Sequence, residues 1–170
     1  KKPKFGFFTT EIEDYIKIAE ELGIKRLSLK GEPIKYARHP LVFLVEAADD
    51  ICYQMMDIED AYKLKLLTPR ETKELYQLFL DEKKKERVEE VFRLVTDENE
   101  QIAYLRATVI GLLVKECTQV FMDNEEAILN GTFEGALIKH ISDPLSNAYK
   151  QCSKVAVEKI YRSRDVLDIE

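Results

Sequence analysis

The sequence predicts an all-α, multi-helix protein. Apolar residues recur every three or four positions along most of the chain, and helix-start signals precede several of these stretches. Hydrophobic residues make up 45% and charged residues 34% of the 170 residues, which is typical of a helical globular protein. No internal repeat, low-complexity tract or linker divides the chain, so we expect one helical domain over residues 1–170.

The first part of the chain is predicted to hold one short and one long helix. Thr10 and Glu13 match a capping box, and the apolar series behind them ends at Gly23. Glycine and proline residues indicate an irregular connector over residues 24–40, with a short strand near the RLSL stretch as an option. We expect the long helix over residues 41–67.

Further helices follow along the rest of the chain. Thr68, Pro69 and Glu71 form a second start signal, for a helix that runs to about residue 80. The charged stretch DEKKKERVEE fits either a solvated helix or a loop, and both readings stay open. Asp97 opens another long helix. Two more helices are expected, from about residue 124 to 130 and from 143 to 161.

Composition excludes several classes of protein. A net charge of −6 and a pI near 5.2 argue against nucleic-acid binding held mainly by phosphate contacts. No apolar run reaches the roughly 18 residues that span a bilayer, so no membrane partner is expected. The three cysteines lie far apart and match neither a disulfide framework nor a CxxC metal motif. We therefore expect reduced thiols and a cytoplasmic protein.

The long helix over residues 41–67 carries an unusual row of carboxylates. A helical wheel of about 100° per residue places six side chains within one arc of about 100°: Glu46, Asp49, Asp50, Tyr53, Asp57 and Asp60. No Lys or Arg lies between Leu41 and Tyr62, although a solvated face usually mixes acids and bases at i, i+4. The row therefore indicates a cation held against it, either a metal ion or basic side chains. A plain solvated face is the alternative.

Two stretches resemble a known enzyme family. Residues 38–68 (RHPLVFLVEAADDICYQMMDIEDAYKLKLLT) closely resemble a segment of bacterial deoxyguanosine triphosphate triphosphohydrolases, which contain an HD domain. The opening KPKFGFF resembles the phosphate-contacting segment that precedes it in the same family. The resemblance implies that the chain is the C-terminal part of such an enzyme, an HD-domain-like helical architecture without the upstream helices that carry the His-Asp pair.

The resemblance implies roles for four residues. Asp49 would be the last ligand of a mononuclear site built from two histidines and two aspartates, with Mg²⁺ or Mn²⁺ as the expected ion. Tyr53 would pack against the deoxyribose, and Asp57 would accept a hydrogen bond from the sugar 3′-hydroxyl. Lys4 would contact the triphosphate. The sequence holds no His-Asp dipeptide, so no catalytic residue is assigned to this chain, and alone it is expected to be inactive.

For the longer parent enzyme, the resemblance implies hydrolysis of a deoxynucleoside triphosphate to the deoxynucleoside and inorganic tripolyphosphate. It also implies a homo-oligomer and a nucleotide activator. Residues 1–67 would contribute to the active site, and residues 68–170 would form a helical scaffold. The alternative is a non-enzymatic interaction or scaffold domain whose acidic face meets a basic partner.

Three further residues invite functional roles but are expected to be structural. His39 lies in a loop before a proline, and His140 is expected to pack or hydrogen-bond rather than to ligate a metal. Arg106 is expected to form an ordinary ion pair.

Overall fold

The computed structural model describes residues 7–161 and contains seven α-helices over that range. They are α1 (Ile12–Glu21), α2 (Pro40–Lys63), α3 (Pro69–Gln77), α4 (Glu82–Leu94), α5 (Glu98–Asp123), α6 (Glu125–Leu129) and α7 (Asp143–Ala156). Two 3-10 turns, η1 (Thr9–Glu11) and η2 (Leu137–Lys139), and a π-helical turn, η3 (Val157–Tyr161), complete the helical elements. The all-α prediction is confirmed, and over residues 7–161 the optional strand is reduced to one isolated bridge between Arg26 and Tyr36.

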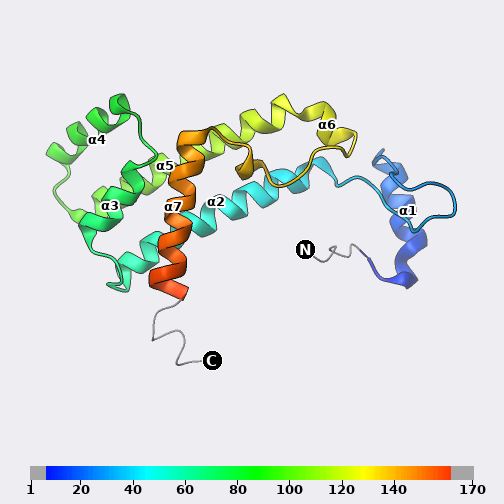
Figure 1. The fold of residues 1–170 in the computed structure, drawn as a ribbon, viewed down its shortest axis with the longest axis horizontal. Helices are drawn as coiled ribbons and strands as arrows, with labels where there is room; N and C mark the ends of the chain where they lie inside the picture. Colours follow the sequence, from blue (N-terminus) through cyan, green and yellow to red (C-terminus); the bar gives the residue numbers. More distant parts are fainter. Residues whose placement is uncertain (1–6, 162–170) are drawn as a thin grey trace.

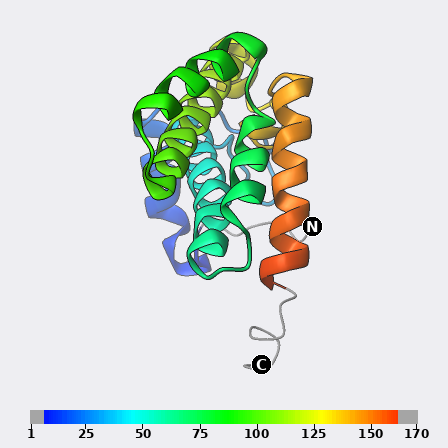
Figure 2. The same cartoon turned by 90° about the vertical axis from the view of Figure 1, so that its left-hand side faces the viewer.

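Helices α2 and α5 form the centre of the molecule. They pack along each other, and α7 and η2 also contact α2, while α3 packs on both α5 and α7 (Figure 1). The end view shows α7 standing beside α2 and α3 (Figure 2). Apolar side chains from these helices form one core, which includes Ile51, Met55, Ile58, Leu105, Val109, Leu113 and Leu137. None of the helices in residues 7–161 combines the length and the apolarity needed to cross a bilayer.

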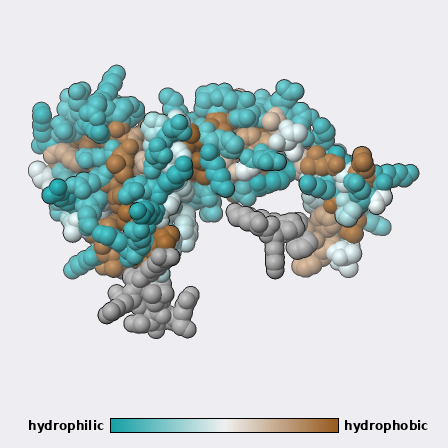
Figure 3. Space-filling model, viewed as in Figure 1, coloured by the Kyte–Doolittle hydropathy of each residue, from teal (hydrophilic) through white to brown (hydrophobic). Residues whose placement is uncertain are grey.

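Helix α1 and the connector behind it lie at the opposite end from α4 (Figure 1). Lys25 Nζ donates a hydrogen bond of 3.1 Å to Asn130 Oδ1 and ties the connector to the end of α6. Gly131 has a φ of +71°, and a Cβ there would lie 2.8 Å from the Ala37 Cβ, so this crossing requires glycine. Figure 3 shows hydrophobic residues exposed over α1 and the connector, where Leu22 and Leu29 are 58% and 71% exposed.

Two helices start where the sequence predicted, and a third does not. The capping box of α3 is present, with Glu71 N donating to Thr68 Oγ1 at 3.2 Å and Thr68 N donating to Glu71 Oε2 at 2.8 Å. Asp97 caps α5 as expected. The predicted capping box of Thr10 is wrong, because Phe8 N donates to Glu11 Oε2 at 2.9 Å. The chain enters its first turn at Thr9, which puts Thr10 inside η1.

Two predicted boundaries are refined. Helix α2 ends at Lys63 rather than near residue 67, because Lys65 adopts a left-handed conformation with a φ of +61° and turns the chain toward α3. The charged stretch from Asp81 onward is a helix, α4, whose first turn is capped by the Asp81 carboxylate accepting from Lys84 N at 2.8 Å.

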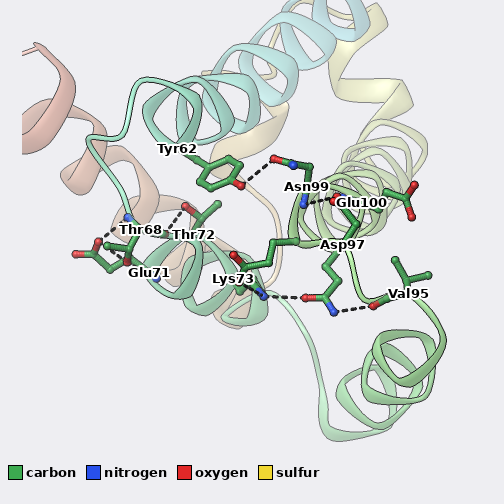
Figure 4. Close-up of polar contacts among 11 residues, drawn as sticks. Tyr62, Thr68, Glu71, Thr72, Lys73, Val95, Asp97, Asn99 and Glu100 are labelled. Carbon is green, nitrogen blue, oxygen red and sulfur yellow. Dashed lines mark hydrogen bonds and ion pairs between the residues drawn. The ribbon is translucent and has the colours of Figure 1, made fainter.

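Polar contacts join α2, α3 and α5 near the C-terminal end of α2. Tyr62 OH donates to Asn99 Oδ1 at 2.8 Å, and Lys73 Nζ donates to Gln101 Oε1 at 2.7 Å (Figure 4). Gln101 Nε2 in turn donates to the Val95 carbonyl oxygen at 2.7 Å. The Tyr62 bond therefore ties α2 to α5, while the bonds of Lys73 and Gln101 tie α3 and the segment before α5 to α5.

Candidate functional site

Basic side chains lie at both ends of the acidic row on α2. Arg38 Nη2 lies 2.6 Å from Glu46 Oε1, at the N-terminal end. Near the other end, Arg106 forms an ion pair with the buried Glu59, as expected for an ordinary structural arginine. Lys63 Nζ lies 3.9 Å from Asp60 Oδ1. At its ends, the row is therefore compensated by side chains of this chain.

The middle of the acidic row differs from its ends in its charged neighbours. We call Asp49, Tyr53 and Asp57 the central row; they recur every fourth residue, so they lie on successive turns of one face. Tyr53 is 62% exposed, Asp49 is exposed, and Asp57 is half-buried. Among the residues that the structure describes, no basic side chain pairs with the Asp49 carboxylate.

The central row borders a concave surface. Five residues line a depression of about 240 Å³: Asp49, Asp50, Tyr53, Gln54 and Tyr149. A second depression, of about 500 Å³, shares two of these lining residues, Asp50 and Tyr149, and extends toward Lys150. The larger of the two depressions is in the volume range of small-ligand sites. Asp49 and Tyr53 thus lie at the edge of a hollow rather than on a flat, open face.

The last helical segment, α7 with η3, holds this surface through three hydrogen bonds to α2. Tyr149 OH donates to the Asp50 carbonyl oxygen at 2.9 Å, and Ser153 Oγ donates to Gln54 Oε1 at 2.5 Å. The third bond lies farther along, where Tyr161 OH donates to Asp57 Oδ2 at 2.5 Å. None of these three residues of α7 and η3 was predicted from the sequence. The only signal they give is that Tyr149 and Ser153 lie four residues apart.

Gln54 is a polar residue at the buried side of the smaller depression. The residue is only 9% exposed, and within residues 7–161 its Nε2 is the one buried side-chain nitrogen or oxygen without a hydrogen-bond partner. A buried donor without an acceptor costs free energy, so an oxygen placed in the depression would stabilise it.

Tyr149 and Tyr161, the two tyrosines that α7 and η3 bring to this surface, are hydrogen-bond donors at neutral pH. Burial, with a smaller effect of the Asp50 charge, raises the pKa of Tyr149 to about 12. Partial desolvation and the hydrogen bond to Asp57 also raise the pKa of Tyr161, which is 41% exposed. A phenol with a raised pKa keeps its proton, so neither tyrosine can act as a general base.

The described residues do not form a complete metal site. Over residues 7–161 no group of three or more His, Cys, Asp or Glu side chains is placed to hold an ion. Asp49 offers one carboxylate, whereas protein-bound divalent ions need several ligands. The assignment of Asp49 as a ligand therefore stays a prediction, and it requires donors from outside the described range. The predicted triphosphate contact, Lys4, also lies outside the described residues.

Neither histidine of the chain serves as a donor at the central row. His39 Nδ1 accepts a hydrogen bond of 3.2 Å from Leu41 N and so caps the start of α2. His140 Nε2 lies 2.9 Å from the Glu134 carbonyl oxygen, and its ring packs against Phe133. The structural roles expected for both are confirmed.

An exposed apolar strip runs beside the acidic row. It consists of residues on successive turns of α2: Leu41, Val45, Ala48, Cys52 and Met56. Val45 is 68% and Met56 is 52% exposed. Helix α2 therefore has three sides, a core side, an acidic side and this apolar strip. A helix face of this kind is typical of a contact surface for another polypeptide.

Comparison with known proteins confirms the family resemblance. The chain is 30% identical, over 167 residues that cover 96% of it, to a deoxyguanosinetriphosphate triphosphohydrolase-like protein of Pseudomonas aeruginosa. It is 35% identical, over 136 residues or 80% of its length, to a protein of the same name from Synechocystis sp.. No family model matches the chain. The matches cover 36% and 29% of these two proteins, so the chain spans about a third of the length of the curated relatives.

Proposed function

We propose that this chain supplies one wall of the active site of a deoxynucleoside triphosphate triphosphohydrolase. The complete protein would hydrolyse a deoxynucleoside triphosphate to the deoxynucleoside and inorganic tripolyphosphate. The main support is the central row, in which Asp49, Tyr53 and Asp57 lie on successive turns and the first two line a depression in the surface. The names of the two relatives point to the same kind of chemistry.

Each residue of the central row has a proposed role that fits its side chain. Asp49 is one carboxylate ligand of a divalent ion, Mg²⁺ or Mn²⁺, whose other ligands lie outside the described residues. The exposed ring of Tyr53 offers an apolar surface to the deoxyribose. The Asp57 carboxylate accepts a hydrogen bond from the sugar 3′-hydroxyl.

The remaining roles rest on the resemblance alone. Lys4 is the proposed triphosphate contact, since an ammonium group suits a dispersed phosphate charge. An HD-domain arrangement, a homo-oligomeric assembly and a nucleotide activator are proposed for the complete protein on the same ground. The reacting groups are proposed to lie in its other segments.

The test is an assay of tripolyphosphate release by the full-length protein from each of the four deoxynucleoside triphosphates, with and without Mn²⁺. Asp49→Ala should lower activity by about 100-fold or more, because loss of even an outer-shell partner of a metal ligand costs about 10- to 100-fold. Glu89→Ala, on an exposed side of α4, is the matched loss of a carboxylate and should leave activity unchanged. A folded and fully active Asp49→Ala protein would show that the ligand assignment is wrong.

The alternative function is a non-enzymatic interaction domain. One observation favours it, the apolar strip on α2, which is suited to another polypeptide whether or not the protein is an enzyme. The two functions give different assay results. A full-length protein that releases no tripolyphosphate from any of the four nucleotides, with or without Mn²⁺, would support the interaction domain.

A further inference from the structure

Tyr161 reaches the central row from the far end of the described chain. Its hydroxyl donates to Asp57 Oδ2 at 2.5 Å, across 104 residues of sequence. Tyr53 lies close enough to the same phenol to contribute to its raised pKa. Tyr161 therefore bonds to one of the residues to which the proposed function assigns the sugar and lies near the other.

The π-helical turn η3 explains how Tyr161 comes to face α2. An uninterrupted α-helix would rotate Tyr161 by about 80° away from Ser153, which bonds to Gln54 on α2. A π-turn winds more slowly, at roughly 80° per residue, and so brings Tyr161 back to within about 20° of Ser153. Lys159 Nζ, in the same turn, lies 2.6 Å from Glu71 Oε1 of α3 and holds η3 in place.

The bond from Tyr161 limits how the Asp57 carboxylate can turn. The terminal torsion of an aspartate is broad, so an unrestrained carboxylate samples many orientations. A short bond to an ionised acceptor is stronger than a neutral one and removes much of this freedom. A carboxylate has about four acceptor sites, so after binding Tyr161 it can still accept a bond from a ligand.

We propose that Tyr161 is a positioning residue, whose hydroxyl holds Asp57 Oδ2 and thereby directs Oδ1 toward the hydroxyl group of a bound sugar. This inference rests on the proposed function, because that function assigns the sugar to Asp57. It adds a requirement on the ligand. Since Asp57 can only accept, the group it meets must be a donor, and a nucleotide without the sugar hydroxyl gains nothing from Tyr161.

The test compares a deoxynucleoside triphosphate that the full-length protein hydrolyses with its 2′,3′-dideoxy analogue. Tyr161→Phe keeps the ring and removes only the hydroxyl. We expect it to raise the KM for the deoxynucleotide about 3- to 10-fold, the loss typical of one hydrogen bond, and to leave the KM for the dideoxy analogue unchanged. In an Asp57→Ala protein the same substitution should have no further effect, because Tyr161 acts through Asp57.

Tyr62→Phe is the matched control, since it also removes one tyrosine hydrogen bond, to Asn99, at a distance from the central row. It should leave both KM values unchanged. If Tyr161→Phe raises both KM values equally, or changes neither, the inference is overturned while the proposed function stands. If the unsubstituted protein hydrolyses no deoxynucleotide, the proposed function fails, and the positioning role fails with it.

Discussion

The ion pair between Arg106 on α5 and Glu59 on α2 should contribute measurably to stability. The Glu59 side chain is 12% and the Arg106 side chain is 30% exposed, so the pair is largely shielded from water. Arg106→Met would keep most of the apolar stem but would leave Glu59 without this partner. Removing one member of a fully buried pair costs about 3–5 kcal/mol, whereas exposed pairs contribute about 0–1 kcal/mol.

Two features of the structure lower the expected cost. Arg106 is partly exposed, so solvent screens the pair, and Lys63 Nζ, 3.2 Å from Glu59 Oε1, remains as a second partner. We therefore expect Arg106→Met to lower the free energy of unfolding by about 2 kcal/mol. For a chain of this size this corresponds to a fall in Tm of about 4–8 °C.

The measurement is urea-induced unfolding of the chain followed by circular dichroism. Arg70→Met is the matched control, because Arg70 pairs with Glu74 on the solvent side of α3, where its side chain is 87% exposed. This control should unfold at the same urea concentration as the unsubstituted chain. Equal midpoints for the two variants would refute the argument that shielding gives the Glu59–Arg106 pair its strength.

Two further predictions concern stability. Gly131→Ala should cost about 1–3 kcal/mol by urea unfolding, because the new Cβ would meet Ala37. Gly23→Ala, at a similar φ of +64° but with nothing within 4 Å of its Cβ, should cost less. The Lys159 hydrogen bond, followed by those of Thr68, lowers the pKa of Glu71 to about 2 from 4.5. A lowered folded-state pKa gives stability above the unfolded pKa, so the Tm difference between the unsubstituted chain and Glu71→Gln should be full above about pH 5 and should vanish toward pH 2. A difference that does not depend on pH would contradict this assignment.

Helices and their starts were predictable because their signals are local. A cap such as Thr68 with Glu71 needs only four consecutive residues, and the structure confirms it. The end of α2 was not predictable in the same way. Its left-handed residue is Lys65, whereas such positions are usually marked by glycine. Thr10 and Glu13 carry the right residue types, but the chain begins its turn two residues earlier, with Phe8 at the N-cap.

The residues of the candidate site also differ in whether a local sequence signal marks them. The central row lies within a single helix, so a helical wheel was enough to group Asp49, Tyr53 and Asp57. Tyr149 and Tyr161 reach α2 from 99 and 104 residues away along the sequence. One sequence carries no signal for contacts over such separations, and the π-turn that brings Tyr161 round has no recognisable motif either. These residues can be recognised only in the structure, where α7 packs against α2.

The central row lies on one unbroken helix, and this has a consequence for changes in chain length. The rise of about 1.5 Å per residue places the Cα atoms of Asp49 and Asp57 about 12 Å apart, whatever side chains lie between them. Inserting one residue between them would swing Asp57 round the helix by about 100° and separate it from Tyr161. The same insertion in the connector before α2 would leave this spacing untouched. Natural length variation among functional homologues should therefore fall in the connector and not between these two aspartates.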